Sequence, residues 1–447
     1  MTKILLCSVF AFSGIFLSVA APKIVDGSVK MEQRPGHGDV IISYSLDDAP
    51  GIVTVDIQTN AGENAWTSIG GAAFVNALSG DVGRCVDAGD RKIVWKPRVS
   101  WPDRVVAQGG IRAVLTAWAT NAPPDWLAVN LTRQEDYWFC ESEDMLPCGP
   151  VGTVASKTDW LVMKKVKAAG VRWVMGSNPL DKVLNKLNHK VDSMRTNETP
   201  HFVTLTEDYY MGVYEFTQAQ FMAVGGTWSD ASKYPSLTNL PLYPLVGSAW
   251  STFRGSTAWP GAVDATKVEM HTVKGTSPIG LLRARTGIDF DMPTEAQWEF
   301  ACRAGSAAQL YNGLTAGAAN VDPLAHTPEN TSESTLIMYS DGKTTESSET
   351  LVQSVGGKQP NAWGFYDMLG NAHEFCLDYW DNFSSEEVVD PIGPAVSGSG
   401  TGRVRRGGGT GIGGADDCRC AYRSYTNQGA AYFHNGFRVM CPLTLKW

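Results

Sequence analysis

Three segments in the last third of the chain decide its fold: MPTEAQWEFACRAG (292–305), NAWGFYDMLGNAHEFCLDYW (361–380), and RVRRGG (403–408) with the CRCAYRS (418–424) and NGFRV (435–439) that follow it. In the first segment, Thr294 and Gln297 have the spacing of a capping box, in which threonine caps a helix and glutamine reaches back to the threonine backbone. This predicts a helix that begins after Thr294 and ends near Gly305, with Trp298 and Cys302 facing inward.

Two more helices are predicted by the same local signals. Thr217 and Gln220 form a second capping box, which predicts a short helix ending near Gly225. Ser277 followed by Pro278 opens another helix, which is expected to stop at Gly287. Irregular stretches dominate elsewhere, at 306–360 and 384–402.

The amino-terminal part has a different pattern. Short runs rich in β-branched residues are separated by Gly, Asp and Pro turns, which is typical of an all-β module. The predicted strands are 40–46, 52–57, 91–95 and 111–118. We therefore expect a β-sandwich of the immunoglobulin or fibronectin type III class at 23–130, a connector at 131–156 and a second domain at 157–447.

The first residues have the features of a secretory signal peptide. Lys3 precedes an apolar run, and Ser18-Val19-Ala20 supplies small residues before a cleavage site, so 1–20 is predicted to be removed. No later apolar run is long enough to span a bilayer. We expect an exported protein (periplasmic, secreted or on the cell surface) with no membrane span in the mature chain.

The charge argues against a nucleic-acid partner. The chain of 447 residues has a formal net charge of −9, whereas nucleic-acid binding needs a basic surface. RVRR (403–406) is the only tight basic cluster.

Together, the three segments resemble the sulfatase-modifying-factor family, to which the formylglycine-generating enzyme belongs. The resemblance covers the chain from about Trp160 to Trp447 and implies an α+β, loop-rich fold of the C-type-lectin-like class. It also resembles the ligand-binding domain of diversified variable proteins, which present the segment corresponding to 406–440 as a variable face.

The resemblance implies a calcium loop within Asp367–Glu374, since the family's ligands fall at Asp367, Gly370, Ala372 and Glu374. Two carboxylates and two backbone carbonyls suit a hard cation. The alternative is a helix N-terminus with favourable acidic residues. A second family calcium site would begin at Asn320-Val321.

Cysteines are expected to be mainly structural, because an exported protein can keep disulfides. The resemblance pairs Cys302 with Cys420, with two buried thiols as the alternative. Cys140 and Cys148 flank Pro147 and are candidates to close a small loop. Cys85, Cys376, Cys418 and Cys441 have no assigned partner.

The catalytic residues of the family are not matched. The family holds copper between two thiolates, which suit Cu(I), and oxidises a protein cysteine. Here the two cysteine positions fall on Ile412 and near Ala415, a serine position on Gly409 and a tryptophan position on His373. Cys418 is a lone, weak candidate thiol.

We therefore predict a non-catalytic domain that binds a protein, peptide or carbohydrate ligand, with calcium as cofactor. The small, polar and aromatic residues at 406–440 suit a recognition surface. The alternative is a metal-dependent oxidase of the family that acts on protein cysteine, in which case copper would be needed.

Overall fold

The computed structural model describes residues 21–60, 62, 65–74, 76–102, 109–177, 197–227, 239–255, 259, 273–331, 335–338, 344–347, 352–395, 400–411, 414–443 and 445. The predicted signal segment and Ile412 lie outside these ranges. Among the described residues, no helix has the length and apolar character needed to cross a membrane.

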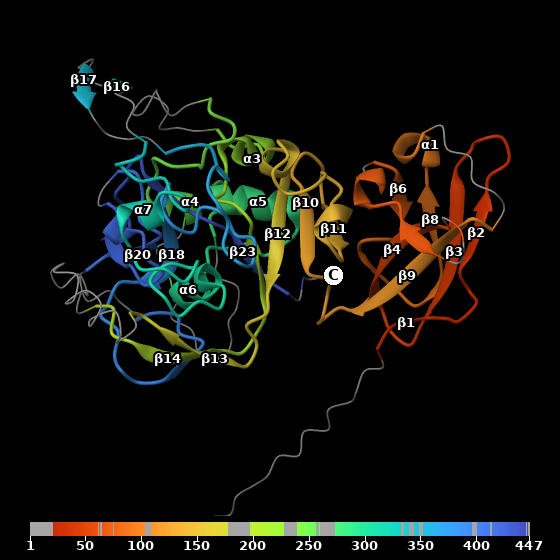
Figure 1. The fold of residues 1–447 in the computed structure, drawn as a ribbon, viewed down its shortest axis with the longest axis horizontal. Helices are drawn as coiled ribbons and strands as arrows, with labels where there is room; N and C mark the ends of the chain where they lie inside the picture. Colours follow the sequence, from red (N-terminus) through yellow and green to blue (C-terminus); the bar gives the residue numbers. More distant parts are fainter. Residues whose placement is uncertain are drawn as a thin grey trace, which may run out of the picture.

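The amino-terminal part consists of two antiparallel sheets that share one apolar core (Figure 1). One sheet has the order β1-β3-β8-β6 with β2 beside β3, and the other β5-β4-β7 with β9 beside β4. The four predicted strands correspond to β3, β4, β8 and β9. The bounds are β1 Lys23–Ile24, β2 Lys30–Gln33, β3 Val40–Asp47, β4 Gly51–Asn60, β5 Trp66–Ser68, β6 Leu78–Gly80, β7 Cys85–Val86, β8 Gly89–Trp95 and β9 Ile111–Ala119.

The core of the amino-terminal part is formed by strand residues that alternate between buried and partly exposed positions. In β3, Ile42, Tyr44 and Leu46 are buried, whereas the serines between them are partly exposed, as expected for successive residues on opposite faces of a strand. They pack with Val53, Val55 and Ile57 of β4. The assignment to the immunoglobulin or fibronectin type III class remains a prediction.

The second part is built on a five-stranded sheet, ordered β11-β10-β12-β15-β23. Its strands are β10 (Trp126–Asn130), β11 (Asp136–Cys140), β12 (Trp160–Val166), β15 (Tyr209–Gly212) and β23 (Met440–Pro442). Residues 126–140 thus form a hairpin of this sheet. The expected boundaries, with a first domain ending at 130 and a connector at 131–156, divide this hairpin. The pairing of β10 with β12 joins segments about thirty residues apart, which local sequence signals do not reveal.

Two smaller sheets complete the second part. One has the order β13-β14-β19 and the other β21-β20-β18-β22, and β16 and β17 pair as a separate hairpin. The bounds are β13 Val171–Met175, β14 His201–Leu205, β16 Thr335–Met338, β17 Thr344–Ser347, β18 His373–Tyr379, β19 Val388–Val389, β20 Gly402–Arg406, β21 Ser424–Asn427 and β22 Asn435–Gly436.

The helices are short, and the three predicted from caps are present. Thr217 and Thr294 each form the complete capping box, and Ser277 accepts from Gly280 N at 3.1 Å. The helix that Ser277 caps ends at Thr286, and the next residue, Gly287, is its C-terminal cap with a φ of 70°. The bounds are α1 Pro97–Ser100, α3 Gln218–Ala223, α4 Trp250–Arg254, α5 Pro278–Thr286, α6 Glu295–Arg303 and α7 Ala318–Val321.

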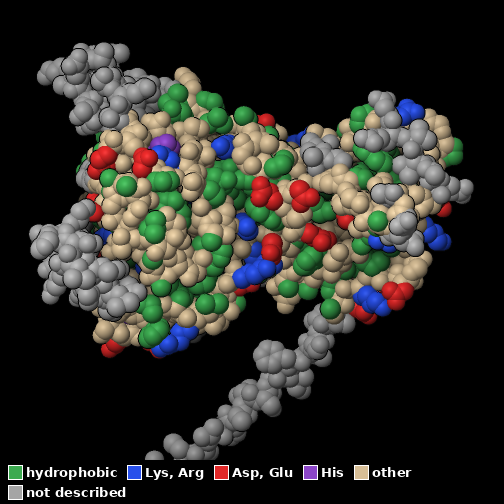
Figure 2. Space-filling model, in the orientation of Figure 1, with side chains coloured by type: hydrophobic (Ala, Val, Ile, Leu, Met, Phe, Trp, Pro, Cys, Tyr) green, Lys and Arg blue, Asp and Glu red, His purple; other side chains and the backbone are tan. Residues whose placement is uncertain are grey.

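The two parts are in contact through β10 and β11. Phe139 N donates to Gly83 O at 2.7 Å, and Ile52 of β4 packs into the core of the second part. Figure 2 shows Asp and Glu side chains gathered on the face where the two parts meet.

Candidate functional site

The three motif segments meet at α6, β18 and β20. Glu374 on β18 lies opposite Arg406 on β20, and it accepts a hydrogen bond from the Trp298 indole of α6 at 2.7 Å. Arg406 forms a buried ion pair with Glu299, and its Nε lies 3.3 Å from Glu295. The helix cap therefore orients α6 so that its two glutamates face the arginine of the strand.

The predicted calcium loop forms a tight turn leading into β18. Asp367 and Gly370 have φ values of 55° and 76°, so the segment is not a helix N-terminus. Asp367 Oδ2 accepts from Gly356 N at 2.6 Å. Both oxygens of Glu374 are already engaged, one by Arg438 at 2.7 Å and the other by Trp298. A cation held by Glu374 would have to share that carboxylate with Arg438.

A third carboxylate, Glu215, lies beside this loop and was not predicted. It accepts from Ala372 N at 2.9 Å and from the Asn371 side chain at 2.6 Å. Burial and the negative charges of Asp367 and Glu374 raise the pKa of Glu215 well above its ordinary value. Burial likewise raises the pKa of Asp367 to about 6. The sequence feature that could have pointed to Glu215 is its position two residues before the predicted helix cap at Thr217.

Neither predicted calcium site forms a complete side-chain cage. In the described ranges no three His, Cys, Asp or Glu side chains are grouped closely enough to hold a metal ion. Asn320 and Val321 lie in α7, and the Asn320 amide donates to Thr315 O at 3.0 Å. Three buried carboxylates, those of Glu215, Asp367 and Glu374, nevertheless interact with one another, and Arg438 and Lys157 are positive charges that act on Asp367.

The structure brings Cys302 and Cys420 together. Their thiols are hydrogen-bonded to each other and fully buried. Cys140 and Cys148 are also buried near each other. All eight described cysteines are free thiols here, so both disulfides remain predictions.

Gly409 and His373, which the resemblance aligned with catalytic positions of the family, lie in a buried polar cluster. Gly409 lies against His373, since a Cβ on Gly409 would be 3.2 Å from His373 N. The rings of His373 and His434 are 5.4 Å apart, and Arg405 Nη1 lies 3.5 Å from His434 Nε2. Ala415 begins a short 3-10 turn. Cys418 is 1 % exposed, and burial raises its pKa, which keeps it a neutral thiol.

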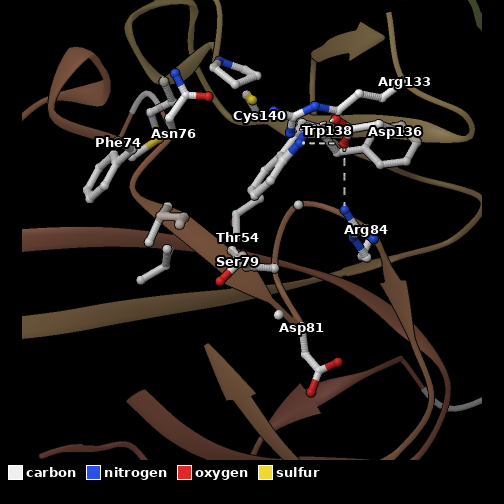
Figure 3. A pocket seen from close by; sticks show the side chains of 18 of the residues that line it. Thr54, Phe74, Asn76, Ser79, Asp81, Arg84, Arg133, Asp136, Trp138 and Cys140 are labelled. Carbon is white, nitrogen blue, oxygen red and sulfur yellow. Dashed lines mark hydrogen bonds and ion pairs between the residues drawn. The ribbon is translucent and has the colours of Figure 1, made fainter. Parts of the chain in front are cut away.

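A cavity of about 840 Å³ is lined by residues of both parts of the molecule, among them Thr54 and Trp138, and Figure 3 shows it from close by. Asp136 is its polar centre: Trp138 Nε1 donates to it at 3.1 Å, and Arg84 and Arg133 lie 3.9 and 3.8 Å away. Asp136, Arg84 and Arg133 thus form a small ion-pair cluster in the wall of this cavity. It was not predicted, because its two walls come from separate parts of the chain.

Comparisons with known proteins agree with the motif segments. Residues 170–442 match the family described as "Sulfatase-modifying factor enzyme 1-like domain". The Formylglycine-generating enzyme of Bos taurus is 32% identical over 151 residues, 33% of this chain and 37% of the relative. The "Serine/threonine-protein kinase pkn1" of Chlamydia pneumoniae is 33% identical over 172 residues, 38% of this chain and 23% of the relative.

The chain thus spans between about a quarter and two-fifths of the length of these two relatives. Among solved structures, Treponema denticola variable protein 1 is similar with a TM-score of 0.43 and 24% identity, covering 65% of this chain and 97% of that protein. The match at 170–442 extends over more than half of the chain. The chain therefore belongs to the sulfatase-modifying-factor family.

Proposed function

We propose that this protein is exported and that its sulfatase-modifying-factor domain binds a ligand without oxidising protein cysteine. The observation that carries this proposal is the polar cluster at the family's catalytic position, where Gly409, His373 and Arg405 lie. Copper-dependent oxidation needs soft ligands, and the surrounding protein does not replace absent ligands.

The thiols that are present are poorly suited to the chemistry. Cys418 is a single buried thiol, and the reactive form of cysteine is the thiolate. Cys302 and Cys420 are adjacent, but both are 0 % exposed, so a peptide substrate cannot reach them.

The test is a peptide oxidation assay. Purified protein, Cu(I) and oxygen are incubated with a peptide containing Cys-x-Pro-x-Arg, and the peptide mass is followed. We expect no conversion to the aldehyde. Conversion that is lost in Cys418→Ser but retained in Cys85→Ser would overturn the proposal and favour the oxidase.

Calcium is proposed as a structural cofactor at Asp367. The proposal is supported by the three buried carboxylates of Glu215, Asp367 and Glu374, which interact with one another, and a hard cation suits such oxygen donors. A cation that binds only the native state stabilises it by mass action. Chelation should therefore lower the melting temperature of the wild type and leave Asp367→Asn unchanged. An identical melting curve with and without chelator would refute it.

Export is proposed from the signal-like segment that ends at Ala20. The amino-terminal part is proposed as an immunoglobulin- or fibronectin-like spacer, which is supported by its two sheets around one core. Expression with the native leader should yield an extracytoplasmic protein whose intact mass corresponds to a chain starting at Ala21. A mass that includes residues 1–20 would contradict cleavage.

A further inference from the structure

Buried arginines of the second part mostly face a carboxylate. Arg438 lies 2.7 Å from Glu374, Arg419 2.7 Å from Glu198, Arg423 2.6 Å from Glu295 and Arg254 3.0 Å from Asp291. Such pairing is expected, because a charge removed from water is costly unless it is compensated.

Arg405 differs from these four arginines. It is 8 % exposed, and no carboxylate in the ranges that the structure describes lies within ion-pair distance of it. Its guanidinium donates to Asn435 Oδ1 at 2.8 Å and to Tyr425 O at 3.4 Å, which are neutral acceptors. A buried cation therefore stands without a counter-charge.

Several buried polar atoms around Arg405 also have no hydrogen-bond partner. They are Arg405 Nε, His434 Nδ1, His373 Nδ1, Asn435 Nδ2 and Ser424 Oγ. The two histidines are 1 % and 2 % exposed and Asn435 is fully buried. Buried polar groups are nearly always satisfied in native proteins, so such a cluster calls for an ion, water or ligand.

The chemistry of these atoms favours an anion over a metal cation. Arginine only donates, so its contact with His434 Nε2 makes that nitrogen an acceptor and leaves the proton of neutral imidazole on Nδ1. Arg405 Nε and Asn435 Nδ2 are also donors. A metal ion would be repelled by the guanidinium, whereas an oxyanion would be attracted to it.

We infer that the cluster of Arg405, His434 and Asn435 is an anion-binding site that receives a carboxylate or a phosphate-like group of the ligand. The inference rests on the proposed binding function and names the chemical group that is bound. His373 Nδ1 adds an acceptor for a hydroxyl of the same ligand, because the other ring nitrogen is hydrogen-bonded to the Arg406 backbone.

The site lies beneath an exposed aromatic side chain. The Tyr432 ring stacks on His434 with centroids 5.7 Å apart, and Tyr432 is 44 % exposed. A ligand that displaces Tyr432 would reach His434 and then Arg405. Aromatic residues of this kind are common in binding surfaces.

The test uses the full mature protein and simple anions. Inorganic phosphate and acetate are titrated at constant ionic strength with chloride as the balancing salt, and affinity is measured from the shift in melting temperature and by calorimetry. We expect saturable stabilisation by at least one anion. Response to acetate alone indicates a carboxylate, and response to phosphate alone indicates a tetrahedral oxyanion; both support the inference.

Variants locate the binding. Arg405→Met should weaken the anion at least tenfold, since hydrogen bonds to charged groups are strong. His434→Asn keeps a donor near the Nδ1 position and should bind more tightly than His434→Leu. Arg172→Gln, which removes an exposed charge paired with Glu387, should bind like the wild type.

Two results would overturn the inference: no saturable response to either anion, or an equal response in Arg405→Met. Melting without ligand is recorded for each variant to establish that it is folded. Peptide oxidation in the separate assay would overturn the proposed function instead, so the two failures are distinguishable.

Discussion

On one face of β20, Arg406 meets Glu299 and Glu295; on the other face, Arg405 meets His434 and Asn435 and no carboxylate. The two arginines are adjacent in sequence, and successive residues of a strand point to opposite faces. The first face fixes α6 against the sheet through ion pairs between Arg406 and two glutamates of α6. The second face has buried donors without a hydrogen-bond partner, so it is the face where a ligand would form the most favourable new hydrogen bonds.

The largest expected effect concerns the predicted disulfide between Cys302 and Cys420, which lies on the Arg406 face. In the exported protein Cys302 and Cys420 should be oxidised, and this bond closes a loop of more than a hundred residues. Reduction, or replacement of both by alanine, should lower the free energy of unfolding by about 4–5 kcal/mol in the chain-entropy model.

Mass mapping after alkylation in denaturant, without reductant, checks the pairing and reports on Cys140 and Cys148 as well. Cys376→Ala serves as the control for loss of a buried thiol. Alkylation of both Cys302 and Cys420 without reductant would show that this face is held by packing and ion pairs alone.

The next prediction compares the two arginines directly. Arg406→Met leaves Glu299 buried without its partner, which should cost about 3–5 kcal/mol of unfolding free energy. Arg405→Met removes an uncompensated charge together with its hydrogen bonds to Asn435, Tyr425 and His434, so its change should stay within about 1.5 kcal/mol. Denaturant titrations in anion-free buffer measure both. Equal losses would mean that the Arg405 face is a structural network like its opposite.

The sequence predicted the local features of this fold well. The capping boxes at Thr217 and Thr294 depend on residues three apart, so they could be recognised without tertiary information. The strands of the amino-terminal part were predictable from their short β-branched runs between Gly, Asp and Pro turns. The hairpin at 126–140 was misplaced because its partner β12 is distant in the chain and its acidic residues favoured a connector.

The candidate site was predicted only in part. The positions of Gly409 and His373 followed from the family motif, but RVRR (403–406) was interpreted as a basic cluster and not as a buried strand. Arg403 and Arg406 are fully buried, and Arg403 lies between the rings of Trp250 and Tyr379. Sequence alone does not reveal which arginine meets an acid, because those acids come from α6.

The smallest expected effect is a pH dependence on the Arg406 face, where Asp378 lies close to Glu295. Asp378 accepts from Glu295 N at 2.8 Å at the start of α6. Burial, and then the charge of Glu295, raise the pKa of Asp378 from 3.8 to about 7, against the smaller opposing effects of its backbone hydrogen bonds and of Arg423. The folded state therefore holds a proton that the unfolded state releases between about pH 4 and pH 7.

Because the folded state binds more protons in that window, stability should fall as the pH rises from about 4 to 7 and level off above it. Asp378→Asn retains an acceptor for Glu295 N and removes the titration, so its free energy of unfolding should fall less over the same range. Denaturant titrations at several pH values compare the two proteins. If their slopes coincide, Asp378 does not titrate over this pH range, and the charges on the Arg406 face do not make the stability of the protein depend on pH there.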